Sequence, residues 1–155
     1  MQQHISPTIK ALIFDLDGVL ADLCDLHRLT FIRAFNSAVG INLLDNDIHE
    51  RHLEGLDTRS KLAVCKSLFP AHFFDADAVF REKQARTADE LALHHFPTRT
   101  ADALTWAKEQ GLILACVTNS IRATMDTVLM RLRIATGFFD VTLIMKMSLL
   151  QNLLL

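Results

Sequence analysis

Two short apolar runs that stop abruptly at polar residues dominate the hydrophobic pattern of this chain. The first covers residues 11–14 and ends at Asp15, and the second covers residues 112–117 and ends at Thr118. Short apolar runs with polar boundaries are typical of buried strands in a parallel sheet. Residues 139–144 give a third candidate strand.

The remaining segments have helical spacing of apolar residues, and several carry recognisable ends. Gly40 stops the first helix, while Asp57 or Thr58 and then Thr100 are candidate N-caps of later ones. The predicted helices cover residues 23–39, 44–54, 58–68, 75–93, 100–110 and 121–133. The order of elements therefore predicts an α/β core that is interrupted after its first strand by an all-helical insertion.

Composition excludes several classes of protein. The 155 residues are 50% hydrophobic and have a formal net charge of −2, which argues against a strongly basic nucleic-acid binder. No apolar run approaches the roughly 20 residues that span a bilayer, and no signal peptide is evident. The three cysteines form no CxxC pair, which disfavours a zinc knuckle or a disulfide framework. We expect a cytoplasmic protein with buried Cys65 and Cys116, without nucleic-acid or membrane partners.

The candidate chemistry lies at the end of the first predicted strand, in Asp15-Leu16-Asp17-Gly18. Residues two apart in an extended chain point the same way, so both carboxylates can face one crevice at the carboxyl end of the sheet. Such a pair suits a hard cation such as Mg²⁺ and can divide nucleophilic and proton-transfer roles. By itself, this motif is a weak signal, because most carboxylates at strand ends are simply solvated.

The longer strings are more specific. Residues 14–20, FDLDGVL, resemble the first motif of the haloacid dehalogenase-like (HAD) phosphohydrolase superfamily. Residues 112–120, LILACVTNS, are similar to its second motif, and the separation of about 100 residues matches members with a helical cap between the two. Asp22 and His27 resemble residues of the phosphatase and beta-phosphoglucomutase branch. The resemblance implies a Rossmann-like parallel core from residues 1–21 and 96–155, and an α-helical cap from residues 22–95.

The resemblance also implies a role for each motif residue. Asp15 attacks phosphorus, carries the aspartyl-phosphate and binds Mg²⁺. Asp17 protonates the leaving oxygen, then activates water, and offers its backbone carbonyl to the metal. Thr118 and the backbone N–H of Asn119 hold the phosphoryl oxygens, with help from the following helix N-terminus. Considered alone, Thr118 is more simply interpreted as a helix N-cap, and Asn119 and Ser120 could cap equally well; only the pairing with the Asp15 motif reverses that interpretation.

Within the cap, Gly55 and Arg59 lie in a segment similar to a substrate-specificity loop. Arg59 could bind a phosphate or carboxylate in bidentate fashion, or could simply be a solvated side chain at a helix start. His27 could contact substrate or pack within the cap.

Other cap residues favour simpler interpretations. Arg81, Lys83 and Arg86 read as one solvated helix face, and His94-His95 as a surface or hinge feature.

The family's third motif, a Lys-Pro pair, and its acidic fourth motif are not recognisable, and Lys146 follows the third predicted strand too early to replace the lysine. A one-base deletion explains this: with one added base, codons that encode residues 145–155 read Asn-Glu-Asp-Val-Thr-Thr-Pro-Lys-Pro-Ala-Pro, with lysine where Asn152 stands. The alternative is a diverged, short chain. We expect an incomplete core, an unpaired edge on the first strand, and little phosphatase activity in this exact chain. Leu149, Leu150, Leu153 and Leu154 have helical spacing and could cover part of the exposed surface, or could equally form a frayed apolar end.

The sequence thus favours a Mg²⁺-dependent phosphatase that acts on a small phosphorylated metabolite, such as a sugar phosphate. A beta-phosphoglucomutase-like phosphomutase, a catalytically dead metabolite-binding or interaction module, and a non-functional gene product are the alternatives. Dehalogenation is less favoured, because an acid/base such as Asp17 belongs to the phosphohydrolases of the superfamily.

Overall fold

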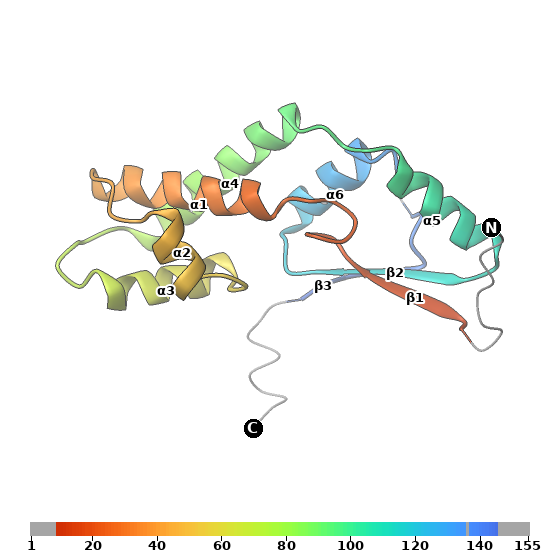
Figure 1. Cartoon of the computed structure of the whole chain (residues 1–155), viewed down its shortest axis with the longest axis horizontal. Helices are drawn as coiled ribbons and strands as arrows, with labels where there is room; N and C mark the ends of the chain where they lie inside the picture. The colour runs from red at the N-terminus through yellow and green to blue at the C-terminus, as the bar shows by residue number, and fades with distance from the viewer. Residues whose placement is uncertain (1–8, 136, 146–155) are drawn as a thin grey trace, which may run out of the picture. The chain divides into compact units, whose positions relative to one another are not determined.

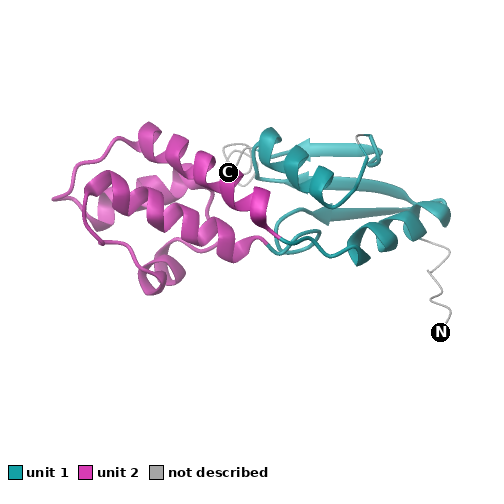
Figure 2. Cartoon of the chain, turned by 90° about the horizontal axis from the view of Figure 1, so that it is seen from above, with its two compact units in different colours: residues 1–22, 95–155 teal, residues 23–94 magenta. Residues whose placement is uncertain are grey.

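The structure, a computed structural model, describes residues 9–135 and 137–145. It divides into two compact units, shown in different colours in Figure 2. Unit 1 comprises Met1–Asp22 and His95–Leu155, and unit 2 comprises Leu23–His94.

Unit 1 contains a three-stranded parallel sheet, which confirms the predicted α/β class. The strands β1 (Ala11–Asp15), β2 (Ile113–Thr118) and β3 (Val141–Ile144) lie side by side in that order. Helix α5 (Arg99–Glu109) precedes β2 and helix α6 (Arg122–Arg131) connects β2 to β3. Figure 1 shows both helices on the same side of the sheet. Within the described residues β1 pairs with β2 alone, so its other edge is unpaired, as the sequence predicts.

Two boundaries in unit 1 differ from the prediction. Thr100 is not an N-cap, because the backbone is already helical at Thr98 (φ −69°, ψ −26°) and a cap residue needs a non-helical conformation. Strand β3 begins at Val141 rather than at residue 139. The reason lies in Asp140, whose carboxylate Oδ2 accepts the backbone N–H of Leu114 at 2.8 Å. That hydrogen bond is the main cause of the lowered pKa of Asp140, and Lys108 contributes to it.

Unit 2 is all-helical, with α1 (Cys24–Val39), α2 (Asn46–His52), α3 (Thr58–Leu68) and α4 (Ala76–Leu93). Its apolar residues form one cluster, in which the Phe35 ring lies 4.9 Å from that of Phe74 and 5.6 Å from that of Phe69. Gly40 ends α1 in the left-handed conformation (φ 76°) that glycine adopts readily. The other buried members of the cluster are Phe31, Ala34, Leu44, Leu53, Leu62, Cys65 and Val79.

Aspartates begin three of the four helices of unit 2. Asp57, one of the two predicted caps, accepts the backbone N–H groups of Arg59 and Ser60, and hydrogen bonds from Ser60 contribute to its lowered pKa although burial opposes that shift. Asp45 caps α2 through Ile48, and Asp75 caps α4 through Asp77 and Ala78. These caps satisfy N–H groups that have no partner within the helix, so the helix starts are fixed by single residues.

We expect Asp75→Ala to lower the free energy of unfolding of unit 2 by about 1 kcal/mol, because α4 loses its cap. Chemical denaturation followed by circular dichroism measures this. Asp89→Ala, an exposed site on the same helix, is the matched control and should change stability by less than about 0.5 kcal/mol. Equal effects of the two substitutions would contradict the capping role.

Candidate active site at the carboxyl ends of the strands

The parallel register places the two sequence motifs at one edge of the sheet. Asp15, the last residue of β1, pairs with Val117, so Thr118 lies one position beyond it at the end of β2. The backbone N–H of Met145 donates to the carbonyl of Thr118 at 2.8 Å and extends β3 to the same edge. In open α/β sheets this edge is where ligands bind.

Asp15 presents its carboxylate at the exposed end of β1. Its Oδ1 accepts the backbone N–H of Leu16 at 2.7 Å, which fixes the carboxylate against its own main chain. Leu16 itself is completely buried. The buried Leu16 side chain anchors the Asp15–Asp17 segment, while the aspartates on either side of it keep their carboxylates at the surface.

A tight turn carries Asp17 back toward the sheet. Gly18 has a positive φ of 82°, a conformation that favours glycine, and its N–H donates to the carbonyl of Ala21 at 2.7 Å. Asp17 and Ala21 form an isolated β-bridge, and Leu20 is buried beneath the turn. The glycine predicted to turn the chain does so.

One hydrogen bond joins the two motifs directly. Ser120 Oγ donates to Asp17 Oδ2 at 2.7 Å, across 103 residues of sequence. Thr118 is 2% exposed, and its Oγ1 accepts the backbone N–H of Ser120 at 3.0 Å. The side chains that follow β1 and β2 therefore form one polar cluster, in which Asn119 is exposed.

Helix α6 begins beyond this cluster. Its N-cap is Ile121, which makes no side-chain capping hydrogen bond, so the interpretation of Thr118, Asn119 or Ser120 as a helix cap is wrong. Thr118 belongs to the strand end, where its hydroxyl holds the turn that presents Ser120.

The site carries negative charge. Burial chiefly, and then the charges of Asp15 and Asp17, raise the pKa of the Cys116 thiol to about 11. Cys116 is thus a buried, protonated thiol beneath the carboxylates, and burial likewise raises the pKa of Cys65 to about 12. The acidic field at the strand ends favours a cation.

The donor set fits Mg²⁺, which takes one or two carboxylates and completes its shell with water and substrate phosphate. Asp15 could supply a carboxylate and Asp17 its backbone carbonyl. Among residues 9–135 and 137–145 no group of three or more His, Cys, Asp or Glu is placed to hold a metal ion. Lys146 lies outside the described residues.

The remaining predicted site residues, His27, Gly55 and Arg59, belong to unit 2. His27 Nδ1 lies 3.2 Å from Lys83 Nζ. Gly55 has a positive φ of 74° and open space where a side chain would stand. Arg59 is exposed, 3.3 Å from Asp77 Oδ1, and its guanidinium lies 4.9 Å from the centre of the Phe80 ring.

The prediction of one solvated face on α4 is wrong for Lys83, which is only 7% exposed. The buried positions of α4 are spaced by four residues and include Lys83 between Val79 and Thr87. Arg81 and Arg86 do not belong to this set of buried positions. Lys83 keeps its ammonium group beside His27, as a long side chain does when its methylene stem is buried.

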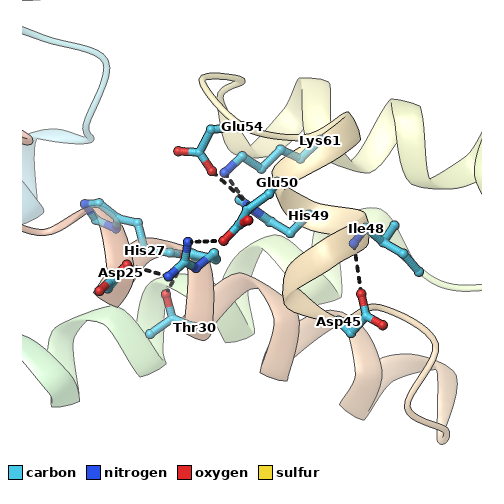
Figure 3. Close-up of polar contacts among 10 residues, drawn as sticks. Asp25, His27, Thr30, Asp45, Ile48, His49, Glu50, Glu54 and Lys61 are labelled. Carbon is cyan, nitrogen blue, oxygen red and sulfur yellow. Dashed lines mark hydrogen bonds and ion pairs between the residues drawn. The ribbon is translucent and has the colours of Figure 1, made fainter.

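His49, a buried histidine in α2, is not predicted from the sequence. Its side chain is 1% exposed, and its Nε2 lies 2.9 Å from Lys61 Nζ while Glu54 Oε2 approaches Nδ1 at 3.4 Å (Figure 3). Burial and the Lys61 cation lower the pKa of His49 from 6.5 to about 4, and burial also lowers the pKa of Lys61. One sequence signal could have indicated its burial: His49 lies four residues before Leu53, so the two share a helix face on which apolar residues are normally buried.

This cluster lies next to the Gly55–Arg59 segment, which joins α2 to α3. Glu54 is the residue before Gly55, and Lys61 follows Arg59 by two. In the same unit, Arg28 pairs with Glu50 and Asp25.

None of the described helices is long and apolar enough to cross a membrane.

The strand-end carboxylates and the Thr-Asn-Ser turn thus lie at the same edge of a parallel sheet. Residues 12–148 match the family model of haloacid dehalogenase-like hydrolases, and the chain belongs to that family. No curated protein sequence matches the chain closely enough to count as a relative.

Solved structures of the family resemble this chain. CbbY from Rhodobacter sphaeroides, determined with xylulose-(1,5)bisphosphate and with phosphate, is 25% identical, with a TM-score of 0.67. A Thermotoga maritima protein assigned as a beta-phosphoglucomutase (23% identical, TM-score 0.64) and a Haemophilus somnus protein assigned as a phosphoglycolate phosphatase (18%, 0.68) share the fold. These matches cover 87–88% of this chain but only 61–63% of those chains.

The lowered pKa of His49 predicts a pH-dependent stability of unit 2. The unfolded histidine binds a proton near pH 6.5 and the folded one near 4, so the free energy of unfolding falls as pH decreases through this window, by up to about 3 kcal/mol. His49→Gln should remove this part of the dependence in denaturation curves measured from pH 7 to 4. His52→Gln, an exposed neighbour on α2, should retain it. Parallel pH dependences of the native chain and His49→Gln would contradict the assignment.

Proposed function

We propose that the protein is a Mg²⁺-dependent phosphatase that hydrolyses a small phosphorylated metabolite through an aspartyl-phosphate on Asp15. The observation that carries the proposal is the Ser120–Asp17 hydrogen bond, which unites the carboxylate motif with the Thr118 turn. Phosphoryl transfer depends mainly on positioning and charge neutralisation, and this cluster offers groups for both.

Asp15 is the proposed nucleophile. Its carboxylate, held by the Leu16 N–H, attacks phosphorus in line with the leaving oxygen, and the P–O bond to the metabolite breaks as the bond to Asp15 forms. The Thr118 hydroxyl and the Asn119 backbone N–H bind the equatorial phosphoryl oxygens. A Mg²⁺ ion on Asp15 and Asp17 would add positive charge against the phosphoryl group.

Asp17 is the proposed acid and base. It gives its proton to the leaving oxygen in the first step and takes a proton from the attacking water in the second. Water then releases inorganic phosphate and restores the Asp15 carboxylate. Ser120 holds the Asp17 carboxylate through its hydroxyl, so it is a positioning residue.

We propose that unit 2 is the cap that selects the substrate, with His27, Gly55 and Arg59 as candidate contacts. Lys83, beside His27, and Arg59 are cationic groups that could meet an anionic ligand. CbbY was determined with a sugar bisphosphate and with phosphate, which supports a phosphorylated sugar as the substrate class.

The test is Mg²⁺-dependent hydrolysis of p-nitrophenyl phosphate, measured for this chain and for the product of the frame-restored gene. In the chain that hydrolyses the substrate, this one or the frame-restored one, Asp15→Asn should lower kcat by about 1,000-fold or more, because the nucleophile is lost. Asp126→Asn, an exposed carboxylate of α6 that is paired with Arg122, is the control and should leave kcat unchanged.

Retention of activity by Asp15→Asn would overturn the mechanism. Transfer of the phosphoryl group to a second sugar hydroxyl, with a bisphosphate intermediate, would instead identify a phosphomutase.

A further inference from the structure

His49 lies between two charged residues that flank the connection from α2 to α3. Its buried ring packs edge-on against Phe31 of α1, with the ring centres 6.1 Å apart. Lys61 Nζ lies 5.6 Å from the centre of the same phenyl ring and 2.9 Å from His49 Nε2. Glu54 Oε2 lies 3.4 Å from the other ring nitrogen, Nδ1 (Figure 3). The imidazole therefore stands between Glu54, which precedes residues 55–59, and Lys61, which follows them.

These contacts define which nitrogen of the His49 ring carries the proton. The Lys61 ammonium group has only donors, so His49 Nε2 accepts from it and the proton resides on Nδ1. The Nδ1–H group faces the Glu54 carboxylate and has no hydrogen-bond partner among the described residues. Because a buried donor without a partner is costly, the attraction to Glu54 stabilises this arrangement. We call the three side chains the His49 bridge.

The backbone between the two ends of the His49 bridge is tightly folded. Gly55 has a positive φ of 74°, a conformation that favours glycine. The N–H of Leu56 donates to the carbonyl of Leu53, whose side chain is completely buried, at 3.2 Å. The turn is thus short and has its ends tied to the interior of unit 2 from both sides, so its conformation depends on the residues that hold those ends.

We propose that His49 is a positioning residue for substrate binding: with Glu54 and Lys61 it fixes the conformation of residues 55–59 and thereby sets the affinity for the phosphorylated substrate. This inference rests on the proposed function, in which Gly55 and Arg59 contact that substrate. His49 is 1% exposed, so it acts through the backbone turn and does not touch a ligand itself. A neutral imidazole suits this role, because it joins a cation to a carboxylate and adds no charge of its own.

Amide hydrogen exchange tests the His49 bridge without any need for turnover. Glu54→Ala removes the carboxylate that faces Nδ1, and Lys61→Met removes the donor to Nε2 while it keeps an unbranched side chain. Each substitution should raise the exchange rate of the Leu56 amide by about 10-fold, because the turn opens more often. The double variant should exceed neither single effect, since both substitutions act through His49.

Glu50→Ala is the matched control for Glu54→Ala. The side chains of Glu50 and Glu54 are each 58% exposed, but Glu50 pairs with Arg28 and not with His49. The control should leave the exchange rate of the Leu56 amide unchanged.

Kinetics with p-nitrophenyl phosphate test the connection to substrate binding. In the chain that hydrolyses it, this one or the frame-restored one, Glu54→Ala should raise KM several-fold and leave kcat nearly unchanged, because the reacting groups lie in unit 1. Glu54→Gln keeps an oxygen that accepts the His49 Nδ1–H group, so its KM should stay close to that of the native chain. Glu50→Ala should change neither constant.

Different outcomes would overturn the bridge, the positioning role and the proposed function. Unchanged exchange of the Leu56 amide in both single variants, additive effects in the double variant, or an equal effect of Glu50→Ala would overturn the His49 bridge. Faster exchange with an unchanged KM would overturn the positioning role and leave the phosphatase assignment intact. Absence of turnover in both chains would overturn the proposed function and with it the role in substrate binding, while the exchange rates would still decide whether the bridge holds the turn.

Discussion

The parallel pairing of β1 with β2 is the constraint on which the rest of the structure depends. It aligns Asp15 with Val117 although all of unit 2 and helix α5 intervene in the sequence. Closing so long a loop costs conformational entropy, but the cost grows only slowly with length, so an inserted domain is tolerated. A slip of one residue would turn every β1 side chain to the opposite face. The proposed chemistry therefore rests on this register.

The Ser120–Asp17 hydrogen bond adds a second link at the same place. The strand ladder brings the two main chains together, whereas this bond orients a functional side chain against the turn after β2. The buried Leu16 and Leu20 secure the carboxylate turn from below, and Thr118 secures the serine turn. A rigid scaffold with its polar groups on loops at the strand ends is a common arrangement for catalytic sites.

Local pattern predicted the strands and helices, whereas the meeting of the two motifs was predicted from the family resemblance. Apolar runs that stop at polar residues marked the ends of β1 and β2, and Asp57 marked the start of α3. The sequence did not predict the environment of Lys83 or His49, since each occupies a position on a packed helix face that only tertiary contacts reveal. The prediction that Thr100 caps α5 was wrong, because the backbone is already helical at Thr98.

The central claim is that Asp15 carries the phosphoryl group, and chemical identification of the phosphorylated side chain tests it most directly. The chain that turns over, this one or the frame-restored one, is mixed with substrate and Mg²⁺ and quenched with borohydride, which reduces an acyl phosphate to an alcohol. The account predicts homoserine at position 15, found by mass spectrometry of the peptides. Reduction at another residue, or turnover with no covalent intermediate, would contradict it.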